Sequence, residues 1–356
     1  MHKELLQLKR DRLTFAMIVG IPVMQMLLFG YAINTDVRDL NAAVANQANT
    51  HLSRQLVSAL EQTQVLQIKY SVASPEELQT LLRTGQVSIG VYLPPDFDRR
   101  SIDTRRSAAQ LMVDGVDPTV LGVANQIRDL PLKFDTGPRE QDRATTFEVR
   151  PYFNPERRSS VFVIPGLIGM ILTLTMMLFT AVAVVREREH GNLELLINTP
   201  VSTTQLMVGK VTPYILIGMI QLALIMSIGR LLFAVPVRGS VVELYMAASV
   251  FIAANLALGL FVSTVVKTQF QAIQMTIFFL LPSILITGFV FPFEGMPRIV
   301  QIIGEGLPNT HFIRLTRGIM LRGASLFELR QELLALGAFT LIAMTAAVLR
   351  FTKRLD

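Results

Sequence analysis

Long uncharged apolar runs divide the chain and predict membrane-spanning helices. A helix needs about 20 mostly apolar residues to cross the hydrocarbon of a bilayer. Five runs of 19 to 26 residues lack Asp, Glu, Lys and Arg, and a shorter sixth lies near the C-terminus; the six are Leu13–Ile33, Val161–Val185, Val211–Gly229, Leu244–Val266, Thr268–Phe293 and Leu333–Leu349. One such run would suit a buried helix of a soluble protein, but one soluble core does not hide six. The pattern therefore predicts an α-helical integral membrane protein with six transmembrane helices.

Basic residues next to the runs predict the orientation of the chain in the membrane. Lys and Arg gather in cytoplasmic loops close to the ends of spans. Here they lie before the first run, after the second, after the fourth and after the sixth: Lys3, Lys9, Arg10, Arg12, Arg186, Arg188, Lys210, Lys267, Arg350, Lys353 and Arg354. All of these share the cytoplasmic side if both termini are cytoplasmic, which is the topology we expect.

Residues 293–332 oppose this rule. The predicted orientation places five arginines of this segment outside, namely Arg298, Arg314, Arg317, Arg322 and Arg330. Prolines and glycines interrupt the segment, so we expect broken short helices rather than a free loop. Such a segment either lies in the outer interface or dips back into the protein. The alternative is that the number of spans is wrong by one.

Residues 34–160 are long enough for a domain and alternate between strand-like and helix-like patterns. Val87–Leu93 alternates as a strand does, and Ser74-Pro75-Glu76-Glu77 is a helix start signal because a capping serine precedes proline and an acidic turn. Further apolar or strand-like segments are expected at 42–46, 65–72, 111–113 and 146–152, and helical ones at 52–62 and from 117 toward 130. The alternation predicts a mixed α/β extracytoplasmic domain inserted between helices 1 and 2.

The composition supports this division of the chain. The mean hydropathy is +0.45 and 17% of the residues are charged, against about 25% in a typical soluble domain. Residues 34–160 contain 15 basic and 16 acidic residues, so the net charge of +6 comes from the membrane part. The excess of positive charge is therefore explained by topology and anionic lipid, and we expect no nucleic-acid partner.

The residue types also limit the chemistry. The chain has no cysteine and four scattered histidines. Disulfide scaffolds and cysteine nucleophiles are excluded, and little room is left for a zinc site. No serine–histidine–acid arrangement is indicated by the spacing. We therefore expect no catalytic residue, no metal site and no enzyme activity in this chain.

Residues 186–210 form a short amphipathic loop between the second and third runs. Leu193, Leu196 and Ile197 fall on one helical face, and Thr199-Pro200 ends the helical pattern. Ser202 or Thr203 suits the cap of a second short helix. Apolar residues exposed on a cytoplasmic hairpin suit docking into the groove of a partner. An interfacial helix resting on lipid fits the residues equally well.

This loop resembles the coupling region of ABC-2 type export permeases of the ATP-binding-cassette transporters. The family pattern is E-R-E-x-G-T-x-E-x-L-x-x-T-P, and the chain carries EREHGNLELLINTP at 187–200, with Asn192 where threonine is common. The resemblance extends along nearly the whole chain to the drug-efflux branch of the family. Segments similar to that branch include KELLQLKRDRLTF, VYLPPDF, LMVDGVDPT and LPSILITGFVFPFEGMP.

The resemblance and the runs together predict one organisation of the chain. Its parts are a cytoplasmic elbow helix at 1–12, transmembrane helix 1 at 13–33, the extracytoplasmic α/β domain at 34–160, transmembrane helix 2 at 161–185, the cytoplasmic coupling loop at 186–210, transmembrane helices 3–5 at 211–292, the outer broken-helix segment at 293–332, transmembrane helix 6 at 333–349 and a cytoplasmic tail at 350–356.

The resemblance also implies a permease subunit that exports a hydrophobic or amphipathic, drug-like or lipid-like compound across the bacterial inner membrane. Its energy comes from separate ABC ATPase subunits. The residues implied in ATPase coupling are Glu187, Glu189, Gly191, Glu194, Leu196, Thr199 and Pro200. The alternative for the acidic residues is that they merely pair with Arg186, Arg188 or Lys210, and surface pairs of this kind contribute little.

The sequence agrees that ATP is bound elsewhere. A phosphate-binding loop requires G-x-x-x-x-G-K-[ST], whereas the one Gly-Lys pair, Gly209-Lys210, is followed by Val211 and lacks the upstream glycine. We expect no cofactor in this chain. The further partners that the resemblance implies are a second copy or a homologous permease, a periplasmic adaptor (membrane fusion) protein, an outer-membrane channel and membrane lipid.

Polar residues inside the predicted spans are sparse. Four are candidates for lining a transport path, namely Gln221, Asn255, Gln271 and Gln274. The alternative is that they form hydrogen bonds between helices. No ionisable residue lies in the middle of a span, and the sequence shows no inverted repeat, which argues against an ion-coupled secondary transporter. A membrane tether or sensor whose outer domain binds a partner remains the second hypothesis.

Overall fold

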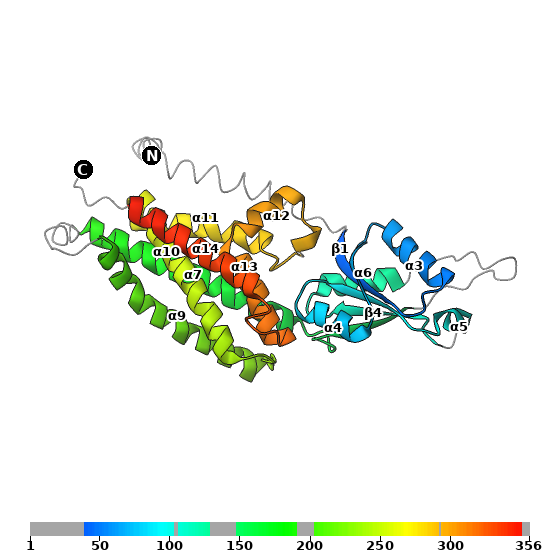
Figure 1. The fold of residues 1–356 in the computed structure, drawn as a ribbon. Helices are drawn as coiled ribbons and strands as arrows, with labels where there is room; N and C mark the ends of the chain where they lie inside the picture. Colours follow the sequence, from blue (N-terminus) through cyan, green and yellow to red (C-terminus); the bar gives the residue numbers. More distant parts are fainter. Residues whose placement is uncertain (1–38, 103–105, 129–146, 191–202, 292, 351–356) are drawn as a thin grey trace, which may run out of the picture.

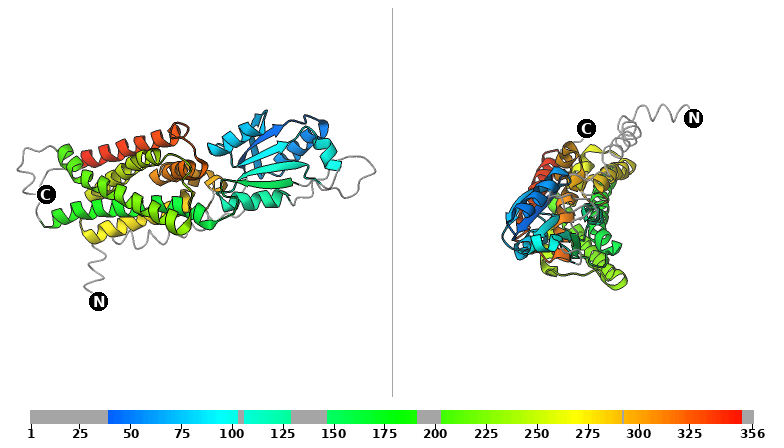
Figure 2. Two further views of the ribbon diagram at one scale, coloured as in Figure 1. Left: turned by 90° about the horizontal axis from the view of Figure 1, so that it is seen from below. Right: turned by 90° about the vertical axis from the view of Figure 1, so that its right-hand side faces the viewer.

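The computed structural model describes residues 39–102, 106–128, 147–190, 203–291 and 293–350. A bundle of long helices forms one part of the molecule, and an α/β domain extends from one end of it (Figures 1 and 2). The predicted elbow helix, the predicted first span and all of the predicted tail except Arg350 lie outside the described residues.

The α/β domain is built on one five-stranded sheet. The strands are β1 Leu40–Asn46, β2 Leu66–Val72, β3 Ile89–Leu93, β4 Ala109–Asp114 and β5 Phe147–Tyr152. Their order across the sheet is β2-β1-β3-β4-β5. β1 is parallel to both β2 and β3, β4 is parallel to β5, and the pair β3–β4 is antiparallel. The sheet is therefore mixed in strand direction.

Helices cover both faces of the sheet (Figure 1). Successive residues of a strand face opposite sides, so Ala42 and Val44 join one core while Ala43 and Ala45 join the other. The helices are α3 His51–Gln62, α4 Pro75–Arg83, α5 Phe97–Ile102 and α6 Pro118–Arg128. α3, α5 and α6 contribute to the first core, and α4 to the second. The start of α4 follows its sequence signal, since Ser74 Oγ accepts a hydrogen bond from the Glu77 backbone N–H.

Five described helices are long and apolar enough to cross a membrane. They belong to α7 Ser159–Glu189, α9 Thr203–Phe233, α10 Val241–Val265, α11 Gln269–Ile286 and α14 Arg330–Arg350. Each contains most or all of one of the predicted apolar runs. The sixth run, at 13–33, lies outside the described residues, so the total of six spans stays a prediction.

Two of these helices, α7 and α9, extend beyond the uncharged apolar runs that they contain. α7 continues through Arg186 and Arg188 to Glu189, and α9 begins at Thr203, upstream of Lys210. The separate short helix expected after Ser202 or Thr203 is therefore wrong, because that segment is continuous with the span. A charge marks the edge of an apolar run, whereas a helix propagates as long as its backbone hydrogen bonds continue.

The centre of the bundle is the pair α7 and α10. Of the residues in their most apolar stretches, 61% and 67% are buried, against 17% for α9 and for α14. Gly259 of α10 permits the close approach, because a Cβ atom there would lie 2.7 Å from the carbonyl oxygen of Met177 in α7. α9, α11 and α14 lie around this pair and expose apolar side chains to their surroundings.

Residues 293–329 form most of the stretch between α11 and α14, and we call them the junction segment. Its elements are the 3-10 turn η1 Phe293–Gly295, α12 Arg298–Glu305, α13 Pro308–Arg317 and the π-helical turn η2 Gly318–Arg322. α12 exposes Ile299, Ile302 and Ile303, whereas α13 is buried along almost its whole length. The Phe312 ring of α13 stacks on the Phe251 ring of α10, with 3.9 Å between ring centroids. α13 therefore dips into the protein.

The helix expected to fill the fifth run ends early. α11 stops at Ile286, and Gly288 adopts a φ of +78°, a left-handed conformation that glycine adopts readily. The predicted span, bounded at 292, therefore extends beyond the helix that is observed. An apolar run does not distinguish a helix from a turn that is buried in protein, and Thr287 here is buried.

We predict that Gly259→Ala destabilises the bundle. The added methyl group has no space against the Met177 backbone, and overpacking a core costs about 1–3 kcal/mol. The thermal unfolding midpoint of the purified protein should fall by several degrees. Gly337→Ala in α14 is the matched control, because a Cβ atom there meets nothing within 4 Å and alanine favours a helix. Equal midpoints for the two variants would contradict the close packing of α7 on α10.

Candidate functional site

Polar contacts gather at the two ends of the bundle. At the end away from the α/β domain, the last turn of α7 is tied to the corner between α10 and α11. The guanidinium group of Arg188 donates to the carbonyl oxygens of Ser263 and Val266, at 2.9 and 3.1 Å. These carbonyls lie at the C-terminal end of α10, where backbone acceptors lack helical partners. Arg188 thus serves as a cap for α10.

Glu189 makes the second link at this end. Its carboxylate accepts from the backbone N–H of Gln269 at 3.0 Å and from the Gln269 side-chain amide at 2.5 Å. Gln269 is the first residue of α11, so the carboxylate binds donors at a helix N-terminus, where negative charge is stabilised. The carboxylate of Glu189 thus links the end of α7 to the start of α11.

The described part of the predicted coupling region is short. Glu187 and Glu189 both lie in the last turn of α7. The other predicted coupling residues, Gly191, Glu194, Leu196, Thr199 and Pro200, lie outside the described residues. Their roles in ATPase coupling stay predictions.

The four predicted path residues lie on three helices and have mostly local partners. Gln221 of α9 accepts a hydrogen bond from Thr175 of α7 at 2.8 Å. Asn255 of α10 is fully buried and donates to the Phe251 carbonyl. In α11, Gln271 accepts from the Lys267 backbone N–H, while Gln274 Oε1 is buried with no hydrogen-bond partner among the described residues. The Gln221–Thr175 bond is the interhelical contact that the alternative reading predicts.

A cavity of about 690 Å³ lies at the other end, between the α/β domain and the bundle. We call it the junction cavity. Its domain side includes Asn41, Lys69 and Ser88, and its bundle side includes Gly288 and Glu294. The remaining charged residues that line it are Asp39, Asp114, Asp117, Arg298, Glu305, Arg314, Arg317, Arg322 and Glu332. None of the four predicted path residues lines it.

Two ion pairs join the domain to the bundle around this cavity. The carboxylate of Asp114, at the end of β4, accepts from Arg322 in η2 with N–O distances of 2.6 and 3.1 Å. Arg83, at the end of α4, binds Glu328 of the junction segment in a bidentate pair. Bidentate arginine–carboxylate pairs fix orientation as well as distance. The domain is therefore held in a defined position on the junction segment.

Glu294 forms a third link across the cavity. Its carboxylate accepts from Ser88 Oγ at 2.9 Å and from Asn41 Nδ2 at 3.4 Å. Both donors are neutral and belong to the α/β domain. Burial raises the pKa of Glu294 above its ordinary value because the charged form loses hydration.

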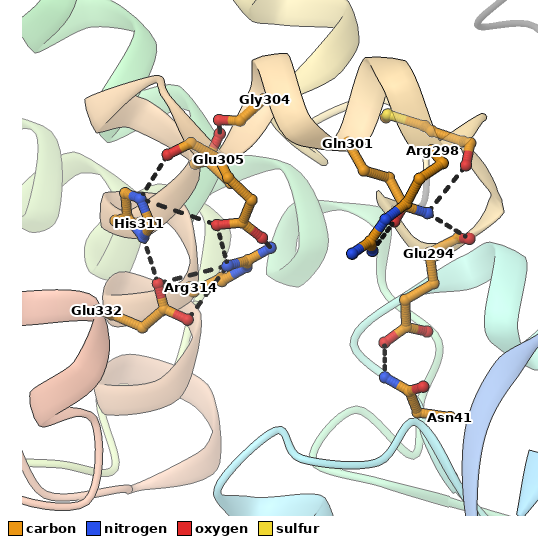
Figure 3. A network of polar contacts seen from close by, with 11 residues as sticks. Asn41, Glu294, Arg298, Gln301, Gly304, Glu305, His311, Arg314 and Glu332 are labelled. Atoms are coloured by element: carbon orange, nitrogen blue, oxygen red, sulfur yellow. Dashed lines mark hydrogen bonds and ion pairs between the residues drawn. The ribbon is translucent and has the colours of Figure 1, made fainter. Parts of the chain in front are cut away.

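A four-residue network holds α12, α13 and the start of α14 together (Figure 3). Arg314 binds Glu305 at 2.7 Å and Glu332 at 3.2 Å. His311 lies beside it, with Nδ1 at 2.5 Å from Glu332 Oε2 and Nε2 at 2.9 Å from the Glu305 carbonyl oxygen. Both ring nitrogens face acceptors, an arrangement that favours the doubly protonated imidazolium form of the ring. Burial lowers the pKa of His311, but these hydrogen bonds outweigh burial and the net pKa is raised.

Sequence reasoning identified the arginines of this end but not their partners. The signal was the group of arginines that opposed the orientation rule. Asp114, Glu294, Glu305, His311 and Glu332 were missed, because ordinary acids and a single histidine carry no recognisable spacing. They come together only through the packing of the domain on the junction segment.

We predict that protonation of His311 stabilises the packing of α12, α13 and α14. A group whose pKa is raised in the folded state stabilises fully below its unfolded pKa of about 6.5, and this contribution is lost as pH rises through the folded-state value. The thermal unfolding midpoint should therefore fall from pH 6 toward pH 9. His311→Gln should remove this dependence in that window, while the exposed control His51→Gln should keep it. A wild-type profile in the His311→Gln protein would contradict the assignment.

Comparison with known proteins agrees with this architecture. The profile of a family described as "ABC-2 family transporter protein" matches residues 12–349. The chain is 28% identical to the "Probable multidrug ABC transporter permease YbhS" of Escherichia coli over 362 residues, covering 99% of this chain and 96% of the relative. It is 30% identical to the "Probable multidrug ABC transporter permease YbhR" of the same organism, with 99% and 97% covered.

A third relative indicates the membrane in which the chain resides. The "Inner membrane transport permease YhhJ" of Escherichia coli is 28% identical over 321 residues, which cover 87% of this chain and 84% of the relative. No solved structure matches the chain significantly. The family profile spans nearly the whole chain and the helices have the length and apolarity of membrane spans. The chain therefore belongs to the ABC-2 family of transporter proteins and is a multi-pass protein of the bacterial inner membrane.

Proposed function

We propose that the chain is the transmembrane permease subunit of an ATP-driven exporter. It moves a hydrophobic or amphipathic compound outward, and a separate ATPase subunit docks on the coupling loop at 186–210. Family membership supports the transport role, and two relatives are described as probable multidrug ABC transporter permeases. Both termini are cytoplasmic in this proposal, the α/β domain is periplasmic, and a second permease completes the pathway.

One observation carries the coupling mechanism. The helix that leads into the coupling loop is bonded at its last turn to both α10 and α11, through Arg188 and Glu189. A displacement imposed on the loop by an ATPase dimer is therefore transmitted to three helices at once. α7 and α10 are also the most buried spans, so this displacement reaches the centre of the bundle. Rigid-body rocking of packed helices is an established mode of conformational change.

The position of the α/β domain supports the proposal that the permease is part of a larger assembly. Its ion pairs with the junction segment hold it on the outer end of the bundle, from which it extends away from the spans (Figure 2). We propose that this domain meets a periplasmic adaptor protein, which in turn connects to an outer-membrane channel. Apolar faces of α9 and α14 that are exposed in the single chain are available to lipid and to the second permease.

The proposal is tested by reconstitution. The chain is coexpressed with its candidate ATPase subunit, purified and placed in inverted vesicles, and uptake of a fluorescent amphipathic compound is followed. We expect copurification of the ATPase, stimulation of its activity by the permease, and uptake that requires ATP and both subunits. A chain that binds no ATPase and transports nothing would instead be the tether or sensor of the second hypothesis.

We predict that Arg188→Ala uncouples ATP hydrolysis from export. The variant loses two hydrogen bonds from a charged donor, each worth about 1.5–3 kcal/mol, and about 1.4 kcal/mol corresponds to a tenfold change. Transport per ATP hydrolysed should fall at least tenfold, while membrane insertion is retained. Arg99→Ala, at an exposed position of the α/β domain, is the control. Normal transport per ATP in Arg188→Ala would refute the coupling role of this corner.

A parallel prediction concerns the loop itself. Glu194→Ala and Pro200→Ala should also uncouple hydrolysis from export without preventing insertion, because both residues match the coupling motif of the family. The measurement is the same ratio of transport to hydrolysis. If both variants export normally, the motif has no coupling role in this chain.

A further inference from the structure

The junction cavity contains charged side chains that the contacts described above do not neutralise. Glu305 and Glu332 together neutralise Arg314 and His311. Asp114 neutralises Arg322. The other charged residues that line the cavity are three cations and three acids, namely Lys69, Arg298, Arg317, Asp39, Asp117 and Glu294. Among the described residues, none of the six forms an ion pair.

Arg317 is the most constrained of these groups. Its residue is 9% exposed, and its guanidinium group lies over the Phe162 ring, 4.4 Å from the centroid. It donates to the carbonyl oxygens of Gly288 and Phe289 at 3.0 and 3.4 Å, while Nε has no partner among the described residues. Burial lowers the pKa of Arg317 to about 10, so the group is still charged at neutral pH. A buried charge with no counter-ion is costly unless a ligand supplies one.

Glu294 is an acid of the same cavity that also lacks an oppositely charged partner among the described residues. Its partners, Ser88 and Asn41, are neutral, so they satisfy hydrogen bonds without balancing the charge. Asp117 lies within electrostatic range of both Glu294 and Arg317, and its Oδ1 accepts from the Thr119 backbone N–H. Glu294 and Asp117 thus line the same cavity as the guanidinium group of Arg317, without an ion pair to it.

Equal numbers of opposite, unpaired charges around one cavity suit a ligand that carries both signs. We propose that the junction cavity binds a zwitterionic phosphate–ammonium group, with the phosphate at Arg317 and the ammonium at Glu294 and Asp117. A guanidinium group matches phosphate oxygens in its planar geometry, and carboxylates accept hydrogen bonds from an ammonium group. The volume of about 690 Å³ lies within the usual range for small-molecule sites.

This ligand chemistry has two sources, a phosphatidylethanolamine headgroup or a soluble zwitterion such as glycerophosphoethanolamine. The site is a property of the single chain, so binding is measured on the purified permease without ATPase, separately from the proposed transport function. Native mass spectrometry in detergent compares phosphatidylethanolamine with phosphatidylglycerol, which has the phosphate but no ammonium. Isothermal titration with glycerophosphoethanolamine tests the soluble source.

Two substitutions separate the halves of the site. Glu294→Gln should weaken phosphatidylethanolamine or glycerophosphoethanolamine binding about tenfold and leave phosphatidylglycerol binding unchanged. Arg317→Gln should weaken binding of every phosphate ligand, and Arg317→Lys should restore part of it. Glu61→Gln is the matched control, because Glu61 is an exposed carboxylate on α3 and does not line this cavity. It should bind as the wild type does.

The outcomes decide the proposal. Binding of the lipid alone or of the soluble compound alone supports it and identifies the source. Equal affinity for both lipids, or an unchanged affinity in the Glu294→Gln protein, overturns it. Absence of binding by all three probes overturns it as well, because the charges are then neutralised by water only. If Arg317→Gln does not fold, as judged by gel filtration, the Glu294→Gln result decides.

Discussion

A charged side chain loses much of its hydration when it enters hydrocarbon or protein, and this constraint determines how the molecule is built. The middle of the described spans contains no ionisable residue. Charged groups instead gather where the helices end, and there they need partners from other elements. Each end of the bundle thereby becomes a joint, since the group that satisfies a charge belongs to a neighbouring helix or to the α/β domain.

The two joints use different chemistry. At the proposed cytoplasmic end, Arg188 binds backbone carbonyls at the end of α10, and Glu189 binds N–H donors at the start of α11. These contacts use the unpaired groups of helix ends, so they need no opposite charge. At the domain end, Arg322 and Arg314 bind carboxylates. Partly buried ion pairs depend on geometry for their stability, and this joint therefore fixes how the domain is placed.

Features that depend on the local periodicity of the sequence were predicted correctly. Features that depend on the packing of distant segments were not. The apolar runs anticipated the location of α7, α10 and α14, and alternation anticipated β3, because both signals are local. The early end of α11 at Ile286 was not predictable, since the turn at Gly288 is stabilised by Arg317, which lies far along the chain. The candidate site shows the same division. The excess of arginines at 298–330 was visible, but Asp114 is their partner only because β4 ends beside η2.

One helix connects the two joints. α7 has 31 residues, which corresponds to a length of about 46 Å at 1.5 Å per residue. Each of its ends takes part in one of the two joints. Near its start, Phe162 lies under Arg317 and the Pro165 carbonyl accepts a hydrogen bond from Thr316. At its end, Arg188 caps α10. A ligand that reorients Arg317 and an ATPase that displaces Glu189 act on the same rigid element. Under the two proposals, occupancy of the junction cavity and loading of the coupling loop are therefore linked through α7, and by thermodynamic linkage each changes the other by the same free energy.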